Sequence, residues 1–597
     1  MSGARALRGL WAAPVAVLAL LVGSLATAGA TFAVPAERHA SAAALYVAPG
    51  ADPDGDGTAG QPFATIDQAQ RPAHQLSADA DVVVYLAGGT YRLSKPLTFG
   101  SGDGGQNGHT ITYQAASGQQ PVVTGARPVV NWQVHDQSTN IWSAHIGTGV
   151  NTRQLYVNGK EAPRAAIQVP RSAFTFTQTG LTVTDPSLDY LAGLSDKSHM
   201  EVESVNSFTD RYAPVQSISG RTITMQQPAW NNNSWGYDTI NAPFAGGTMY
   251  LENNYAFLKQ AGQWYLDSST GDLYYRAQPG QNPNTLDVEL PQLQSLLGIS
   301  GSYGSPATGL GFAGIRFTGT SWLGPSGSDG YADQQSGAHI TGAHAMPANW
   351  LSTCKSGCTQ FEATRNHWVQ MPAAVQVSAA TGITFSGNTF SELGQAGLGV
   401  GNDGAATASG TGLGAGDITI TDNTFTDIAG SGSQVGGIQP DAHHPGNPQM
   451  TNHDITVSNN RVSGVGLQRG GPGRGRGGLD QTAPSPAWPG AAFLSGGPHF
   501  RSPGLREPAY VNVTRRTGTM PADAPREWAP PSATRPRSDE SCPCPLRGPG
   551  DGCRCPCGCP CAEHRRSSSR SCCSPRPFPS SPSDRHNPPP HSATGSR

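Results

Sequence analysis

The chain has 597 residues, of which 76 are Gly and only 13% are charged. This length allows several domains or one long repeat architecture, and the composition suits strands joined by tight turns more than helical bundles. The net charge of −3 hides an uneven distribution: residues 469–597 hold 18 Arg and nine acidic residues, which leaves 20 basic and 32 acidic residues, a net charge of −12, for the rest. An acidic body gives no reason to expect a nucleic-acid partner.

The first residues have the features of a targeting segment. Arg5 and Arg8 precede an apolar run at 10–22, and small residues suited to a cleavage site follow. This pattern predicts a signal peptide over 1–30 and an extracellular, secreted protein. The apolar run is short for a membrane span and no other segment is longer, so we expect no membrane span after cleavage.

Next in chain order, residues 45–150 are expected to begin the main architecture. A short helix is predicted to start after Thr65, which is a suitable capping residue. Apolar runs bounded by turn residues predict strands at 45–47, 81–91, 109–115 and 120–126.

An acidic turn lies inside this first part. Asp52, Asp54 and Asp56, followed by Gly57, match the first half of a calcium-binding loop. Such a loop needs a bidentate Glu where this chain has Phe63. We therefore predict a plain turn and no required cofactor, with a weak calcium site as the alternative.

Residues 151–295 have a different pattern. Stretches such as GRTITMQQPAW and GQWYLDSSTGDLYY alternate apolar residues and end in turn dipeptides. This alternation predicts an inserted antiparallel, β-sandwich-like module.

Residues 296–466 contain a phrase that occurs three times, as ITFSGNTFSEL, ITITDNTFTDI and ITVSNNRVSGV. Aligned on Ile383, Ile418 and Ile455, all copies carry apolar residues two, seven and ten positions later and an Asn five positions later. The period of two predicts a strand with one inward face. The Asn predicts a corner, because Asn tolerates left-handed backbone geometry. VQVS, LGVG and GGIQ are expected to form further strands.

This repetition predicts an all-β protein built as a parallel β-helix. One coil cannot bury its own apolar face, so the phrase must recur in stacked coils. Equivalent residues would then form ladders with a spacing of about 4.8 Å. A β-sandwich is the alternative, but sandwiches rarely repeat an Asn at a fixed offset.

The pattern stops at residues 467–597, which hold 24 of the 49 Pro and nine of the 11 Cys. A segment this rich in Pro and Arg cannot build a core, so we predict disorder. A sharper hypothesis is that this segment is an out-of-frame product of a GC-rich gene, because the change is abrupt; a genuine basic tail is the alternative.

The other two cysteines are Cys354 and Cys358. In an exported protein we expect them to close a small loop by a disulfide, with two free thiols as the alternative. A zinc site is not expected, because no second Cys/His pair lies nearby.

Several phrases carry a family resemblance over roughly 45–466, among them VVVYLAGGTYRLSKPLTF, ENNYAFLKQAGQWYLDSSTGDLYYRA and GGIQPDAHHPGNPQM. The chain resembles family 141 glycoside hydrolases and related secreted right-handed β-helix proteins of the pectate-lyase-like superfamily. The resemblance implies a right-handed coil and a carbohydrate-active enzyme. Family members usually continue through further coils with a Gly/Trp-rich stretch that this chain lacks, so the chain resembles a version truncated after about residue 466.

The most informative polar cluster is QPDAHHPGNP, with Asp441, His443 and His444. It follows a predicted strand, and loops beside a rigid scaffold concentrate functional groups. Glycoside hydrolysis needs two carboxyl groups. We expect Asp441 to be one of them and His443 or His444 to orient it or to hold a sugar hydroxyl. Alternatively, the loop residues only cap turns.

The second carboxylate is not fixed by the sequence. Asp403, in GVGNDG, is one candidate. Glu392 and Asp427 form another, because they lie at equivalent offsets, nine residues after Ile383 and Ile418, although polar corner ladders are common on β-helix surfaces. Sugar rings stack on aromatic side chains, which are more often core residues. The candidates for stacking are Trp230, Trp235, Trp322 and Trp368.

Together these features predict a secreted, monomeric glycoside hydrolase that acts on plant or microbial polysaccharide. A polysaccharide lyase with calcium and a basic residue is the weaker reading, because no cluster of three acidic residues with a nearby Arg stands out in the repeats. A non-catalytic glycan-binding protein, or an inactive truncated enzyme, is the third.

Overall fold

The computed structural model describes residues 42–333, 337–403, 414–438 and 447–466. The chain divides into two units, Met1–Arg516 and Thr517–Arg597, and every described residue belongs to the first. The predicted signal peptide, the cluster Asp441, His443 and His444, and the predicted tail lie outside the described residues.

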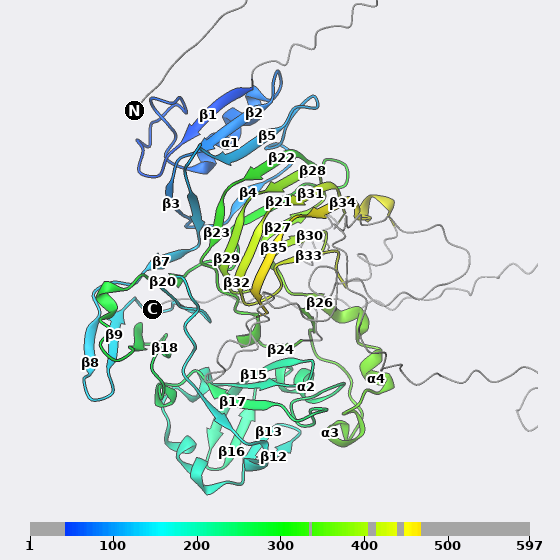
Figure 1. The fold of residues 1–597 in the computed structure, drawn as a ribbon. Helices are drawn as coiled ribbons and strands as arrows, with labels where there is room; N and C mark the ends of the chain where they lie inside the picture. The colour runs from blue at the N-terminus through cyan, green and yellow to red at the C-terminus, as the bar shows by residue number, and fades with distance from the viewer. Residues whose placement is uncertain (1–41, 334–336, 404–413, 439–446, 467–597) are drawn as a thin grey trace, which may run out of the picture. The chain divides into compact units, whose positions relative to one another are not determined.

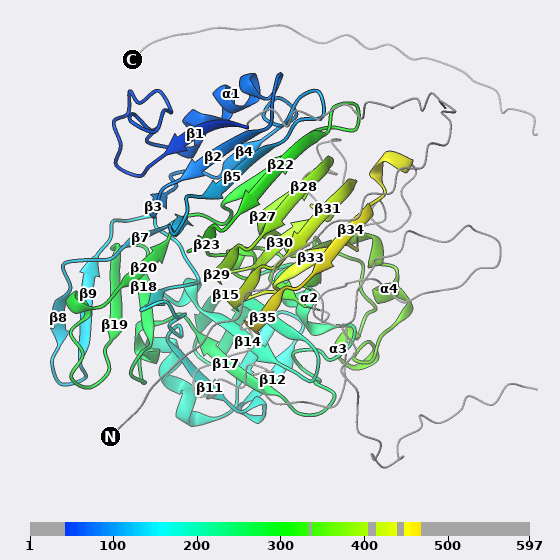
Figure 2. The same ribbon diagram turned by 45° about the horizontal axis from the view of Figure 1, so that its top comes forward.

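Three parallel sheets form a β-helix-like coil, and the chain visits them in turn (Figures 1 and 2). The first sheet contains β1 (Ala43–Val47), β2 (Val82–Leu86), β5 (Ile111–Ala115), β22 (Ala307–Ala313), β28 (Ala380–Ser386), β31 (Ala415–Thr421) and β34 (His453–Ser458). The second contains β3 (Gly89–Arg92), β6 (Pro121–Thr124), β23 (Arg316–Thr318), β29 (Thr389–Leu393), β32 (Thr424–Ile428) and β35 (Arg461–Val465). The third contains β4 (Leu97–Phe99), β21 (Leu297–Ser300), β27 (Ala373–Ser378), β30 (Ala396–Val400) and β33 (Ser433–Val435).

The register of the coil is the one that the repeated phrase predicts. Ile383 pairs with Ile418, which pairs with Ile455. Their side chains are at most 6% exposed, and Phe390 and Phe425 stack with ring centroids 4.8 Å apart. The apolar positions therefore form continuous ladders inside the coil. VQVS and LGVG fall largely in β27 and β30, whereas the described residues of GGIQ, 436–438, follow β33 instead of forming the strand.

The corner asparagines have a different role from the one predicted. Asn388, Asn423 and Asn460 are not among the residues with left-handed backbone. Their amides form a ladder: Asn423 Oδ1 accepts from the Asn388 N–H (2.9 Å), and Asn460 Oδ1 accepts from the Asn423 N–H (2.9 Å). Each side chain thus satisfies main-chain groups of the neighbouring coil. The left-handed residues stand one position earlier and are Gly387, Asp422 and Asn459.

Antiparallel pairing begins earlier than the predicted boundary at residue 151. β7 and β20 pair, and β9 pairs with β19, so residues 126–145 belong with the antiparallel part because their hydrogen-bond partners do. Three sheets make up this part. They contain β7 (Ala126–Pro128), β10 (Tyr156–Val157) and β20 (Val288–Pro291); β8 (Gln133–Asp136), β9 (Ile141–His145), β18 (Trp264–Asp267) and β19 (Asp272–Arg276); and β11 (Ala166–Val169), β12 (Phe174–Thr177), β13 (Gly180–Val183), β14 (Glu201–Val205), β15 (Asp210–Ser219), β16 (Thr222–Met225) and β17 (Thr248–Glu252), with β24 (Tyr331–Ala332) on β15.

A hairpin of β25 (Ala338–Ile340) and β26 (Trp368–Gln370) follows β24. The helix predicted after Thr65 is present, and the Thr65 N–H donates to Gln68 Oε1 (2.9 Å). None of the helices in the described ranges is long and apolar enough to cross a membrane. The helices are α1 (Ile66–Leu76), α2 (Ala229–Ser234), α3 (Trp350–Thr353) and α4 (Thr359–Glu362), with 3₁₀ helices η1 (Arg171–Ala173), η2 (Pro186–Gly193), η3 (Lys197–His199), η4 (Tyr255–Phe257), η5 (Pro283–Thr285), η6 (Gly324–Ser326), η7 (Arg365–His367) and η8 (Pro448–Met450).

Candidate functional site

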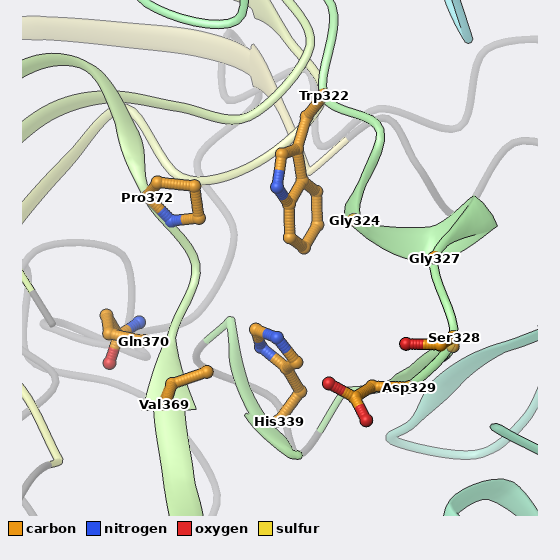
Figure 3. A pocket seen from close by; sticks show the side chains of 10 residues that line it. Trp322, Gly324, Gly327, Ser328, Asp329, His339, Val369, Gln370 and Pro372 are labelled. Carbon is orange, nitrogen blue, oxygen red and sulfur yellow. The ribbon is translucent and has the colours of Figure 1, made fainter. Parts of the chain in front are cut away.

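A pocket of about 290 Å³ lies between the loop that follows β23 and the β25–β26 hairpin (Figure 3). The loop contributes Trp322 and a turn around η6, and the hairpin contributes an imidazole and an amide. The pocket therefore combines one large aromatic ring with several polar groups, which is typical of a small-molecule site. Its lining residues are Trp322, Gly324, Gly327, Ser328, Asp329, Gly330, His339, Val369, Gln370 and Pro372.

The Trp322 ring is held by its neighbours on the loop. A Cβ at Gly324 would lie 2.3 Å from the indole, so this close approach requires Gly. Tyr331 packs edge-on to the indole at 5.0 Å, and His339 lies 5.8 Å from it. Trp322 is 5% exposed, and its ring lies along the cavity in Figure 3. The ring position is thus fixed before any ligand binds.

His339 supplies a neutral imidazole to the pocket. Burial lowers the pKa of His339 to about 4, although a contact with the Gly337 carbonyl and the charge of Asp329 oppose the shift. The Asp329 carboxylate lies next to the His339 ring in Figure 3, and its Oδ1 accepts a hydrogen bond from the Gly342 N–H (2.9 Å). The pocket therefore contains one carboxyl side chain and, at neutral pH, no cationic lining residue.

A buried ionic cluster fastens η6, whose Gly324 lines the pocket, to the antiparallel part. Arg153 Nη1 pairs with Glu201, and Arg164 Nη2 lies 3.2 Å from Glu201 Oε1. Ser326, at the end of η6, donates to Glu201 Oε1 (2.5 Å). Burial opposes ionisation of Glu201, but the charges of Arg153 and Arg164 outweigh it and hold its pKa at about 2. This carboxylate is fully partnered, so its role is to fix the pocket wall.

A second buried carboxyl group lies on the same face of β14. Burial, followed by the charges of Glu252 and Asp210, raises the pKa of Glu203 well above its usual range. Tyr212 donates its hydroxyl to Glu203 Oε1 (2.8 Å). Glu201 and Glu203 alternate with Val202 in strand β14, a pattern in the sequence that could have drawn attention to this face.

A third carboxyl group, Glu161, lies on the turn after β10 and is only partly buried. Burial raises the pKa of Glu161 to about 7; the charge of Arg153 and a hydrogen bond with Gln154 oppose the shift, whereas Asp427 and Glu252 add to it. Glu161 therefore changes charge near neutral pH, which Glu201, with its pKa of about 2, does not.

Of the four tryptophans predicted to contact sugar, Trp322 alone lines the pocket. Trp230 and Trp235 are 0% exposed, and Trp368 is 5% exposed. Trp230 stacks on Phe176 and Trp235 belongs to an apolar cluster, so these two rings fill the protein interior and offer no face to a sugar. Trp368 does not line the pocket, and the Arg365 guanidinium lies over its ring, 4.3 Å from the centroid.

Among the described residues, none of the predicted carboxylates lines this pocket. Asp403 is partly buried and is not a lining residue. Glu392 and Asp427 do lie at equivalent positions on adjacent coils, at a left-handed residue in each. Glu392 is occupied by an ion pair with Arg316 (2.6 Å). Asp441, His443 and His444 lie outside the described residues.

Cys354 and Cys358 form the predicted disulfide, which links the region between α3 and α4. Within the described ranges, no group of three or more His, Cys, Asp or Glu side chains is arranged to hold a metal ion. Asp52 and Asp56 accept hydrogen bonds from the main-chain N–H groups of Asp54 and Thr58, as in ordinary acidic turns.

Comparison with known proteins identifies a similar fold but does not establish an activity. No protein-family model matches the chain, and no curated protein matches it. Among solved structures it is similar to one titled "Glycoside hydrolase", with a TM-score of 0.58 and 22% identity over 72% of this chain and 74% of that one. Another, "The complex structure of XylC with xylose", covers 71% of this chain and 62% of that one at 14% identity, and its TM-score of 0.29 supports no argument. The chain has a glycoside-hydrolase-like fold.

Proposed function

We propose that this protein is a glycoside hydrolase that binds one sugar residue of a plant or microbial polysaccharide in the Trp322 pocket. The observation that carries the proposal is the combination of a fixed indole ring with the carboxylate of Asp329, the hydroxyl of Ser328 and the amide of Gln370 around one cavity. Its volume of about 290 Å³ is at the low end for ligand pockets, which favours a single ring over a longer segment.

The chemistry of the lining residues fits a sugar. An indole covers the C–H face of a pyranose, while carboxylate, amide and hydroxyl groups exchange hydrogen bonds with its hydroxyls. The neutral His339 ring can accept or donate a hydrogen bond without adding charge. Binding of this kind leaves the glycosidic bond at the mouth of the pocket.

Hydrolysis itself needs two carboxyl groups, one to protonate the leaving oxygen and one to activate water or to attack the anomeric carbon. We propose Asp329 as one of these groups, because it is the carboxylate among the lining residues. From the sequence, Asp441 is proposed as the other, with His443 or His444 orienting it.

A lyase is the less favoured alternative. A lyase acts beside the carboxylate of a uronate and needs cationic groups or a metal to neutralise that charge. The pocket lining contains neither Arg nor Lys, and the low pKa of His339 keeps its imidazole uncharged at neutral pH. The pocket thus favours an uncharged sugar and, with it, hydrolysis.

Further proposals follow from the fold and the sequence. We propose that the coil is right-handed, because crossovers between parallel strands almost always are. The predicted signal peptide supports secretion, and a monomer is proposed. Membership of glycoside hydrolase family 141 likewise remains a proposal.

The experiment compares the wild-type chain with Trp322→Ala and Asp329→Asn on a panel of neutral and acidic plant and microbial polysaccharides. Release of reducing sugar without the ultraviolet absorbance of unsaturated uronates supports hydrolysis. Both variants should lose at least about tenfold in kcat/KM, which corresponds to about 1.4 kcal/mol. Trp142→Ala, in β9 and outside the pocket, is the matched control. Unsaturated products would indicate a lyase, and binding without product would indicate a glycan-binding protein.

A further inference from the structure

Gln154 links the pocket to a carboxyl group that the proposed function does not use. This side chain is 3% exposed. Its Oε1 accepts hydrogen bonds from the Ser321 hydroxyl (2.7 Å) and from the main-chain N–H of Trp322 (3.2 Å). The backbone of Glu161 pairs with Tyr156, two residues after Gln154, and Gln154 acts on the Glu161 carboxyl group by lowering its pKa. Because the amide oxygen is committed to the loop, the amide nitrogen is the atom left to face Glu161.

We propose that Gln154 is a positioning residue of the sugar pocket, which holds Trp322 in place through its amide oxygen and couples that position to the carboxyl group of Glu161 through its amide nitrogen. This inference goes beyond the proposed function in naming how the ring is held, and it rests on that function only for its consequence in sugar binding.

The packing around Gln154 shows that the contact is built into the fold. A Cβ at Gly394 would lie 2.6 Å from Gln154 Oε1 and 2.8 Å from the Ser321 Cα, so the coil needs Gly where the two segments meet. Two neighbours of Gln154 bind the same loop. The Arg153 N–H donates to the Ser321 hydroxyl (2.9 Å), and the Tyr156 hydroxyl donates to the Thr320 carbonyl (3.0 Å).

The coupling depends on the charge of Glu161. The charged and titratable groups that act on it are Arg153, Asp427 and Glu252, and Tyr156 lies close enough to feel its charge. An ionised carboxylate accepts a stronger hydrogen bond from an amide than a neutral carboxyl group does. The Trp322 loop should therefore be held more firmly above pH 7 than below it.

The test exchanges the amide of Gln154 and the carboxyl group of Glu161. Gln154→Glu keeps oxygen atoms for Ser321 and Trp322 but places a second carboxyl group against Glu161. Glu161→Gln alone keeps an acceptor that no longer titrates. The double variant Gln154→Glu/Glu161→Gln restores one donor and one acceptor with their direction reversed. If Gln154 only filled space, the double variant would hold the Trp322 loop no better than Gln154→Glu alone.

The first readout is amide hydrogen exchange of residues 319–330 in the full chain, measured by mass spectrometry at pH 6 and pH 8 and corrected for the intrinsic rate. This readout does not require a sugar. We expect Gln154→Glu to speed exchange of this segment at least fivefold at pH 8 and the double variant to return it to within twofold of wild type. Glu161→Gln should abolish the extra protection seen at pH 8.

Gln263→Glu is the matched control, because Gln263 is also buried and its Oε1 also accepts two main-chain N–H bonds, from Lys259 and Gln260. It should leave exchange of 319–330 unchanged. The proposal is overturned if Gln154→Glu exchanges like wild type, or if the double variant is no better than the single one.

The second readout is the affinity for the monosaccharide released by the wild-type chain, measured by calorimetry. We expect Gln154→Glu to weaken binding about tenfold and the double variant to restore it. If the wild-type chain releases and binds no sugar, the proposed function fails, whereas the exchange experiment still decides the role of Gln154.

Discussion

Asn388, Asn423 and Asn460 form the asparagine ladder of the coil. Removal of a single side-chain amide from this ladder should destabilise the coil strongly, although an amide is a small group. Asn423 is 1% exposed; its Oδ1 accepts from the main-chain N–H (2.9 Å) and Nδ2 (3.1 Å) of Asn388, and its Nδ2 donates to the Phe385 carbonyl (3.0 Å). Asn423→Ala leaves the buried Asn388 N–H without its partner and removes the bonds to Asn388 Nδ2 and to the Phe385 carbonyl. At about 1–3 kcal/mol for the unpaired N–H and about 1 kcal/mol for each of the other two bonds, we expect a loss of about 3–5 kcal/mol in the free energy of unfolding.

Urea unfolding followed by circular dichroism measures this loss, provided that the slope of the transition is unchanged. Asn460→Ala is the control, because Asn460 occupies the same position on the next coil but is only partly buried, so that water can replace its amide. We expect a loss below about 2 kcal/mol for this variant. Equal losses, or a loss below about 1 kcal/mol for Asn423→Ala, would refute the role assigned to the ladder.

Three other predictions follow from the core, the carboxyl groups and the disulfide. Phe390→Ala should cost about 3–5 kcal/mol, because the ring is 0% exposed and stacked; a loss in urea unfolding no larger than that of Phe390→Leu would contradict this. Because burial raises the pKa of Glu161 from 4.5 to about 7, the folded state holds this proton more tightly and the free energy of unfolding should fall as pH rises through that range. Glu161→Gln should flatten the pH dependence of the free energy of unfolding in this range. An unchanged pH dependence would contradict the raised pKa of Glu161. Reduction of Cys354–Cys358 should cost about 2 kcal/mol, since the closed loop is short, and a loss above about 4 kcal/mol would require another cause.

The coil was predictable because its pattern is local and repeated. Spacing of two places Ile383 and Phe385 on one strand face, and recurrence of the phrase fixes which residues stack, as Ile418 and Ile420 do on them. The pattern also marks the Asn as a special position, but the left-handed backbone predicted for it is wrong. Its hydrogen-bonding amide, and not its backbone tolerance, is what the corner requires, and a sequence alone does not separate these two uses.

The site was harder to predict because it depends on contacts between distant segments. An indole fills a core and covers a sugar equally well, so the types of Trp230, Trp235 and Trp322 carry no information about which one faces a cavity. Glu201 is paired with Arg153, which lies 48 positions away, and bonds Ser326, which lies 125 positions away. Such pairings follow from the topology and not from any local pattern.

The topology does explain why these segments meet. The antiparallel part is inserted between β6 of the second sheet and β21 of the third, and the Trp322 loop with its hairpin is inserted between β23 and β27, which is the same step one coil later. Because β6 pairs with β23 and β21 pairs with β27, both insertions leave and re-enter the coil at stacked positions. They must therefore pack on each other, as the pairing of β24 with β15 shows. The pocket lies within the second insertion, and the contact of Ser326 with Glu201 fastens its η6 wall to the first. The stacking of the coil thus supports the pocket, while its chemistry is free to vary with the inserted residues.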